Sequence, residues 1–375
     1  MKNIIKKDFL RISFVISTLV ILALPIIFFD SKTTASQQEN RNLAQRPNLF
    51  SNNSFNAKVF SEYDNYLQDR LGGRKSFISL NSKLNKFLHS NASNLNDLAI
   101  KGKLNWYFYI AEGNLADFFK KNLLTEPEKL EFSQTIKATA DWCQAQNIQC
   151  IFLVCPNKHS VYPEFYPFKR PYGATRADQL SQIFEKLGVN YIFPRDYLIS
   201  KKSSFDFPLY YETDTHWNNE GAYLASLLLK GKIQSLFPNV NFPDIEYETK
   251  LDYNPEGSDI PALLNLKGDN TTVPVLYPKN HNNTNFYKYL KNDDRNGVHT
   301  EGTNSSLPRA LIFRDSFFIA LEPFISPLFS EAEYNYWHYF REDDKDYVRE
   351  FKPDIIIFET VERYSLYRFP LAGMK

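Results

Sequence analysis

Short apolar runs alternate with amphipathic segments over most of the chain. Runs with the length and composition of buried strands lie at residues 148–154, 189–193, 309–314, 332–340 and 354–358. Apolar positions at helical spacing lie at residues 125–143, 175–187, 218–237, 317–329 and 344–351. Strands that alternate with helices predict an α/β fold, a doubly wound parallel sheet flanked by helices.

The segments outside this alternation predict the rest of the organisation. Residues 63–89 have the pattern of two helices broken at Gly72-Gly73, and residues 106–110 that of a strand. Residues 241–307 are rich in Asn and irregular, so we expect an insertion of loops or short hairpins there. Residues 30–58 are polar and predict a tether. The folded domain is therefore predicted at residues 59–375.

The N-terminal segment combines basic residues with a long apolar run. Residues 12–29 are mainly apolar and follow Lys2, Lys6, Lys7 and Arg11. The run exceeds the core of a signal peptide, about 7–15 residues, and approaches the ~20 residues that span a bilayer. Basic residues stay on the cytoplasmic side. We predict a cytoplasmic tail at 1–11, a transmembrane anchor at 12–29 and an extracytoplasmic body, with a cleaved signal peptide ending near residues 34–36 as the alternative.

Composition excludes several classes of protein. The chain has 375 residues, 43% of them hydrophobic, which is enough for a large buried core. Its net charge of +1 argues against nucleic-acid binding, which requires a concentrated basic face. Three cysteines cannot form a complete disulfide framework, and the sequence has no CxxC or HExxH motif. We therefore predict neither a metal site nor a cofactor.

The segment Asp214-Thr215-His216 carries the residue types of a catalytic base and its orienting acid. If the segment is extended, positions i and i+2 point to the same side. Asp214 would then reach one imidazole nitrogen of His216 and leave the other nitrogen free as a general base. A serine or cysteine nucleophile would have to come from elsewhere in the chain.

Ser316 is the best candidate for that nucleophile. It follows the apolar run 310–313 and precedes a helical pattern that begins at Phe317. Open α/β sheets bind ligands at the carboxyl ends of their strands, and a helix N-terminus stabilises developing negative charge. The alternative is that Asp315-Ser316 is an ordinary helix cap. The presence of an Asp-x-His segment in the same chain favours the nucleophile.

These motifs resemble those of the SGNH-hydrolase-like sugar O-acetyltransferases, which include the alginate O-acetyltransferases and the DHHW proteins. Asp214-Thr215-His216-Trp217 is similar to the D-x-H-W signature of this family. Five further blocks resemble it in the same order: E-N-R-N-L-A at 39–44, the segment 60–74, V-C-P-N-K with V-Y-P-E at 154–164, R-D-S-F at 314–317 and E-R-Y at 362–364. Arg314 departs from the pattern, because the family has a small residue there.

The resemblance implies roles for individual residues. Ser316 would be the nucleophile, His216 the general base and Asp214 its orienting acid. Lys158, Trp217, Arg314 and Arg363 are the candidates for substrate binding. For Trp217 the alternatives are packing beside His216, where it would fix the approach of the imidazole, and ordinary packing in the core. For the two arginines the alternative is a structural ion pair.

The function that the resemblance implies is O-acetylation of a cell-envelope or exported polysaccharide outside the cytoplasm. Because acetyl-coenzyme A is cytoplasmic, a multi-spanning membrane acyltransferase would present the acetyl group. The protein itself would be a single-pass protein of the cytoplasmic membrane, with its catalytic domain on the periplasmic or extracytoplasmic side. Two alternatives remain open: a carbohydrate esterase with the same triad, and a non-catalytic polysaccharide-binding or assembly protein.

Overall fold

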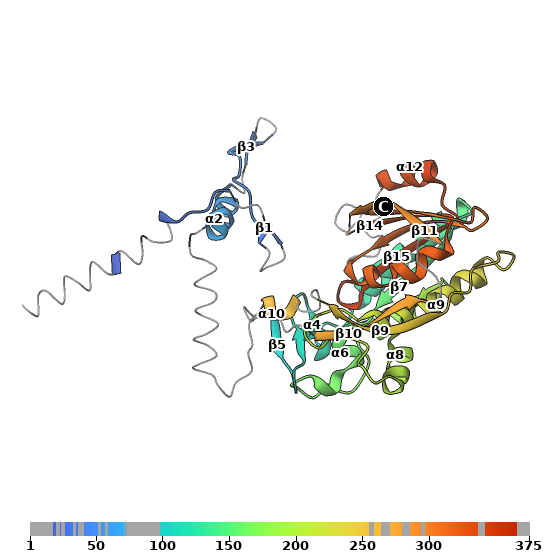
Figure 1. Ribbon diagram of the computed structural model, residues 1–375. Coiled ribbons are helices and arrows are strands. Elements are labelled where there is room, and N and C mark those ends of the chain that lie inside the picture. Colours follow the sequence, from blue (N-terminus) through green and yellow to red (C-terminus); the bar gives the residue numbers. More distant parts are fainter. Residues whose placement is uncertain are drawn as a thin grey trace, which may run out of the picture. The chain divides into compact units, whose positions relative to one another are not determined.

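The computed structural model divides the chain into two compact units (Figure 1). One unit comprises residues 1–96 and 262–267, and the other comprises residues 97–261 and 268–375. The structure describes residues 18–19, 23, 27–32, 35–36, 41–51, 54–56, 59–70, 72, 98–254, 259–263, 271–279, 286–293, 297–336 and 342–365.

The first unit holds helix α2 (Val59–Arg70), the short pair β1 (Ala35–Ser36) and β2 (Arg41–Asn42), and the pair β3 (Phe50–Ser51) and β4 (Ser54–Phe55). The last turn of α2 fixes the segment before it. The backbone N–H of Ala44 donates to Asp69 (2.7 Å), and the buried guanidinium of Arg70 donates to the carbonyl of Ala44 (3.2 Å). Two of the sequence blocks that resemble the family are therefore in contact.

The predicted helix after Gly73 and most of the predicted anchor at 12–29 lie outside the described residues. Within the part of the chain that the structure describes, no helix has the length and apolar character to cross a membrane.

The second unit is built on a seven-stranded mixed sheet. In spatial order its strands are β11 (Tyr287–Asp293), β12 (Gly297–Gly302), β14 (Glu331–Tyr336), β13 (Arg309–Arg314), β15 (Ile355–Val361), β7 (Gln149–Cys155) and β8 (Tyr191–Ile192). The five strands from β14 to β8 run parallel, as predicted. The prediction of an entirely parallel sheet is wrong at one edge, because β12 pairs antiparallel with β14 and β11 antiparallel with β12.

Helices cover both faces of this sheet. Alternate residues of a strand point to opposite faces, and neighbours such as Phe152 and Leu153 or Leu311 and Ile312 belong to two different apolar clusters. Helix α9 (Asn219–Leu236) packs in the cluster on one face. The other cluster contains side chains of α5 (Glu126–Ala145), α7 (Arg176–Leu187) and α12 (Glu342–Phe351). The three cysteines are buried as free thiols.

The predicted insertion contributes regular structure. Strands β9 (Tyr247–Asn254) and β10 (Thr271–Pro278) form an antiparallel pair, with the one-turn helix α10 (Asp259–Leu263) between them in sequence. The same insertion supplies β11 and β12 to the main sheet. Hairpins were expected in this region, but their addition to the sheet was not.

The remaining elements are short. A hairpin is formed by β5 (Ala99–Lys101) and β6 (Tyr107–Tyr109). Single turns and short helices lie at α4 (Asn114–Phe118), α6 (Lys158–Val161), η1 (Pro163–Phe165), α8 (Arg195–Lys201), η2 (Lys202–Ser204) and η6 (Glu362–Tyr364).

The segment after β13 is not the single helix that the sequence predicts. It forms three consecutive short turns, η4 (Ser316–Ala320), α11 (Glu322–Ile325) and η5 (Ser326–Leu328). Pro323 and Pro327 each stand at the start of a new turn, because proline has no N–H to continue the preceding one. Ser316 therefore lies at the carboxyl end of a strand, as predicted, but without the dipole of a long helix behind it.

Replacing Ile357 with alanine tests how far the sheet depends on β15, the middle one of its five parallel strands. Ile357 is fully buried and pairs with Ile312 on one side and Ile151 on the other. We expect Ile357→Ala to lower the free energy of unfolding by about 2–5 kcal/mol, because the shorter side chain leaves a cavity in the core. Urea unfolding measures this loss. Leu130→Ala, at a position 60% exposed on α5, is the control and should cost less than about 0.5 kcal/mol. Equal losses would contradict this account of the core.

Candidate active site

The loop that carries Asp214 and His216 is a compact turn, not the extended segment that the sequence predicts. A single β-bridge between Tyr210 and Trp217 closes it, and the N–H of Tyr211 donates to the carbonyl of His216 (3.3 Å). Within the turn, Oδ1 of Asp214 accepts from the backbone N–H of His216 (2.9 Å) and lies 2.6 Å from its Nδ1. The predicted Asp–His pair forms, but its geometry comes from a side chain folded back on its own loop.

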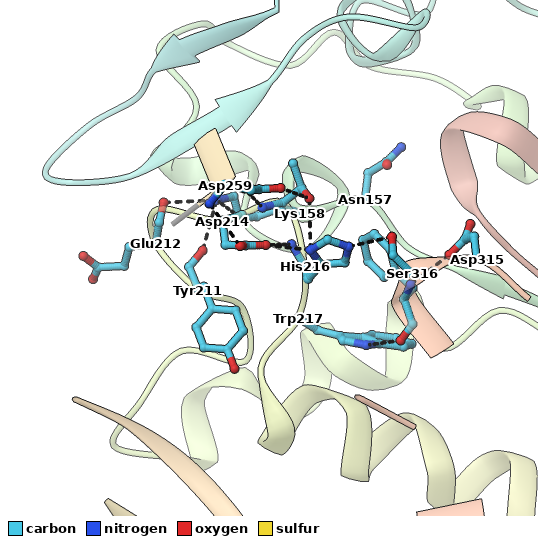
Figure 2. A network of polar contacts seen from close by, with 12 residues as sticks. Asn157, Lys158, Tyr211, Glu212, Asp214, His216, Trp217, Asp259, Asp315 and Ser316 are labelled. Carbon is cyan, nitrogen blue, oxygen red and sulfur yellow. Dashed lines mark hydrogen bonds and ion pairs between the residues drawn. The ribbon is translucent and has the colours of Figure 1, made fainter. Parts of the chain in front are cut away.

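Ser316 meets this pair from the opposite side of the site (Figure 2). Its Oγ lies 2.8 Å from Nε2 of His216. Asp315 fixes the turn that begins at the serine, because its carboxylate accepts from the N–H of Phe317 (2.9 Å) and from the N–H of Val361 at the end of β15 (2.7 Å). The structure therefore joins Ser316, His216 and Asp214 in one hydrogen-bonded chain.

Trp217 ties the two loops together. Its side chain is completely buried, and its indole N–H donates to the carbonyl of Phe317 (2.9 Å). The ring of Phe317 contacts both Trp217 (5.4 Å between centroids) and His216 (4.8 Å). Trp217 thus packs in the core and sets the approach of the histidine to the serine, while its contact to substrate stays a prediction.

The charges of Asp214 and His216 stabilise each other. Burial alone would raise the pKa of Asp214, but the charge of His216 and the hydrogen bonds that the carboxylate accepts hold this pKa below its usual value. Burial would lower the pKa of His216, and the charge of Asp214 outweighs it, so the pKa of His216 lies above its usual value. A base with a raised pKa is a stronger proton acceptor, which suits the activation of a hydroxyl group.

Asp259 completes the surroundings of this pair, and sequence reasoning missed it. Its backbone N–H donates to Oδ2 of Asp214 (3.2 Å), and its carboxylate accepts from the N–H (2.9 Å) and the hydroxyl (2.7 Å) of Thr215. Burial, followed by the charge of Asp214, raises the pKa of Asp259 to about 6. It comes from the one-turn helix α10 in an irregular part of the sequence, where no pattern marks it.

The carboxylates of Asp214 and Asp259 and the imidazole of His216 lie close enough together to be considered as ligands of a metal ion. One ligand atom each from Asp214, His216 and Asp259 lies within 4.8 Å of the others. Those side chains are already engaged, since Asp214 accepts from His216 and Asp259, and Asp259 accepts from Thr215. A cation would have to displace these hydrogen bonds. The arrangement therefore favours proton transfer over metal binding.

Lys158, a predicted contact to substrate, is buried and points at the protein backbone. Only 4% of its surface is exposed, and its ammonium donates to the carbonyls of Tyr211 (3.0 Å), Glu212 (3.0 Å) and Asp214 (2.6 Å). All three acceptors belong to the loop that carries His216. Lys158 therefore contacts the protein backbone, not the ligand side of the site.

Arg314 and Arg363 are also buried. Arg314 is 2% exposed and its guanidinium lies over the ring of Tyr336, so it packs against the protein, and its contact to substrate stays a prediction. Arg363 is 8% exposed, donates to Oδ1 of Asn157 (3.3 Å) and lies over the ring of Phe317. Arg363 thus contacts the serine turn as a packed side chain, and Arg314 donates to the carbonyl of Asp315 at the start of that turn (3.5 Å).

Two buried glutamates at the end of β15 fix the loops that surround Ser316, and sequence reasoning missed both roles. Glu359 accepts from the N–H of Asp315 (2.8 Å), and Glu362 accepts from the N–H of Asn157 (2.8 Å). Burial raises the pKa of each carboxyl group, well above the usual value in Glu359. The family-like E-R-Y block was the only signal in the sequence, and it concerned Glu362.

Comparisons with known proteins place this geometry in a wider group. Residues 99–274 match the family model described as the SGNH hydrolase-like domain of acetyltransferase AlgX, which confirms the resemblance seen in the motifs. The matched range contains Asp214, His216 and Asp259 and ends before Ser316. No curated protein matches the chain.

Two solved structures with TM-scores above 0.5 share this fold at low sequence identity. PatB1 of Bacillus cereus with a sulfonyl adduct has 16% identity and a TM-score of 0.54, over 76% of this chain and 99% of that chain. A second PatB1 structure from Bacillus cereus has 17% identity and a TM-score of 0.52, over 72% of this chain and 97% of that chain. The O-acetyltransferase domain of Pseudomonas putida AlgJ is 18% identical over 74% of this chain and 95% of that chain, with a TM-score of 0.49.

Replacing Asp214 with asparagine tests the electrostatics of the pair. We expect Asp214→Asn to lower the pKa of His216, because the carboxylate that raises it is removed while burial remains. An NMR titration of the imidazole resonances measures the change. His299, which lies 2.9 Å from Glu331 on the neighbouring strand, is the internal control, and its imidazole resonances should be unchanged by the substitution. An unchanged titration of His216 would contradict the assigned source of the shift.

Proposed function

Because this chain carries a domain of the SGNH hydrolase-like acetyltransferase family, we propose that it is an O-acetyltransferase that modifies a polysaccharide. The observation that supports this most strongly is the hydrogen-bonded chain from Ser316 through His216 to Asp214 (Figure 2). Its order and distances are those that activate a serine hydroxyl group.

The first step would transfer the acetyl group to the enzyme. With Nδ1–H of His216 donating to Asp214, the other ring nitrogen, Nε2, is left to accept the proton of Ser316. The serine Oγ attacks the acetyl carbonyl carbon and forms a C–O bond. The bond to the donor oxygen then breaks, and that oxygen takes the proton from His216. The product is an acetyl ester on Ser316.

The second step would move the acetyl group to a sugar. A sugar hydroxyl group gives its proton to His216 and attacks the carbonyl carbon of the serine ester. The bond between that carbon and Ser316 Oγ breaks, and Oγ recovers the proton. Water in place of the sugar would make the same triad an esterase, which is the alternative outcome of the assay below.

Access to the site is compatible with a large acceptor. Ser316 is half-buried and the side chain of His216 is 27% exposed, so both groups reach the surface. The buried side-chain nitrogen of Asn157, whose oxygen accepts from Arg363, has no partner among the described residues. Arg363, which donates to Asn157, stays a candidate for substrate contact.

The acceptor, donor and location are parts of the same proposal. They rest on the family resemblance and on the N-terminal sequence. A multi-spanning membrane acyltransferase would present the acetyl group, the acceptor would be a cell-envelope or exported polysaccharide, and residues 12–29 would anchor the protein with its domain outside the cytoplasm. The basic residues before the apolar run support this orientation.

A reporter fusion tests the location. A reporter that is active only outside the cytoplasm, fused after Lys375, should be active. The basic N-terminus stays in the cytoplasm, so a single span at residues 12–29 would place the rest of the chain outside. The matched control is a reporter that is active only inside the cytoplasm, fused at the same position, and it should be silent. The reverse pattern would overturn the proposed location.

Three single variants test the mechanism: Ser316→Ala, His216→Ala and Asp214→Ala. Each should lower the rate of acetyl transfer from p-nitrophenyl acetate to an oligosaccharide by about 10³-fold or more. Combining the three changes should cost little more than the most severe single change, because residues that act as a unit are not additive. Mass spectrometry of the isolated protein should show an acetyl ester on Ser316.

The control is Ser326→Ala. Ser326 is a buried serine ten residues further on, and its hydroxyl contacts Tyr334 instead of a histidine. This variant should keep wild-type rates. A folded Ser316→Ala protein with wild-type transfer would remove Ser316 from the mechanism, and release of acetate without acetylated sugar would make the protein an esterase.

A further inference from the structure

The loop that positions Asp214 and His216 requires support from outside itself. Residues 211–216 form neither helix nor strand, so most of their carbonyl groups have no partner in regular structure. Buried carbonyl groups need donors, since an unpaired one costs as much as a lost hydrogen bond. The carbonyls of Tyr211, Glu212 and Asp214 converge on one point, which the ammonium of Lys158 occupies (Figure 2).

Lys158 matches this point in number of donors and in charge. An ammonium group has three N–H donors and no acceptor, and three carbonyl oxygens lie within 3.0 Å of it. The rings of Trp106 and Phe108 lie 5.6 Å and 5.2 Å from Nζ and stabilise a cation through their faces. Tyr107, the residue between Trp106 and Phe108, also holds the loop, because its N–H donates to the carbonyl of Glu212 (2.8 Å).

We propose that Lys158 is a positioning residue of the reaction: its charged ammonium clamps the loop that carries Asp214 and His216 so that the imidazole faces Ser316. The inference rests on the proposed function for its kinetic consequence. The clamp itself is a property of the loop and can be measured without activity.

Three carboxylates around Lys158 favour its charged form. The carboxylates of Asp214 and Glu212 come from the loop, and that of Asp259 comes from α10. Burial lowers the pKa of Lys158 to about 7, against the opposing pull of these three carboxylates. Loss of the proton would leave two N–H donors for three carbonyls. The clamp should therefore weaken as pH rises through about 7.

The test compares three variants of the full-length chain. Lys158→Met keeps the length of the side chain without its donors, and Lys158→Arg keeps the charge. Lys202→Met is the matched control, because Lys202 also donates to a carbonyl, that of Val161 (2.9 Å), and lies over an aromatic ring, that of Tyr162. The readouts are kcat and KM for p-nitrophenyl acetate and the far-downfield NMR resonance of the proton between His216 and Asp214.

We expect Lys158→Met to lower kcat about 100-fold with little change in KM, since a displacement of about 1 Å can have that effect. The downfield resonance should be lost in this variant. Lys158→Arg should recover most of kcat and should keep the resonance to a higher pH than the wild type, because arginine stays charged. Lys202→Met should resemble the wild type in both readouts.

A folded Lys158→Met protein with unchanged kcat and an intact resonance would overturn the clamp. So would a raised KM with unchanged kcat, which would mean a contact to substrate. If Lys158→Met does not fold, the wild type and Lys158→Arg still decide: loss of the resonance at the same pH in both would overturn the proposal. Failure of the proposed function is distinguishable, because then wild type and Ser316→Ala would be equally inactive while the resonance still reports on Lys158.

Discussion

An ionised carboxylate buried in the protein, that of Asp214, is the constraint on which the site depends. Burying a charge is costly unless every oxygen finds a partner. Oδ1 is satisfied by the backbone and ring of His216, and Oδ2 by the backbone of Asp259. The requirement of one carboxylate therefore brings together the loop of the histidine and a segment 45 residues away. Orientation of the imidazole follows from meeting that requirement.

The serine half of the site follows the same principle with different residues. Asp315 places its two oxygens on the N–H groups of Phe317 and Val361, so the start of the turn and the end of the central strand cannot move independently. Glu359 accepts from the backbone N–H of Asp315 and thereby fixes the backbone at that residue. The two halves then meet through Trp217 and the carbonyl of Phe317. Reactive groups at the surface are positioned by acids that are themselves inaccessible.

The sequence predicted the parts of this protein that depend on local patterns. Continuous apolar runs located the central strands, and the short Asp-x-His spacing located the pair that the structure joins to Ser316. Proline at positions 323 and 327 was a readable signal against one long helix, and it was overlooked. Lys158 and Arg314 were placed at the substrate because a charged side chain looks the same in a sequence whether buried or exposed. Asp259 could not be found, because its role comes from a contact between segments remote in the chain.

The insertion between α9 and β13 was expected to form loops or short hairpins, yet it contributes to the domain at two places. It extends the sheet with β11 and β12, and it brings the backbone N–H of Asp259 to the carboxylate of Asp214. Exchange of this segment with that of a distant relative would thus change the surroundings of Asp214 and His216 even if every motif residue were retained. The segment is therefore coupled to the site through Asp259, which contacts both Asp214 and Thr215.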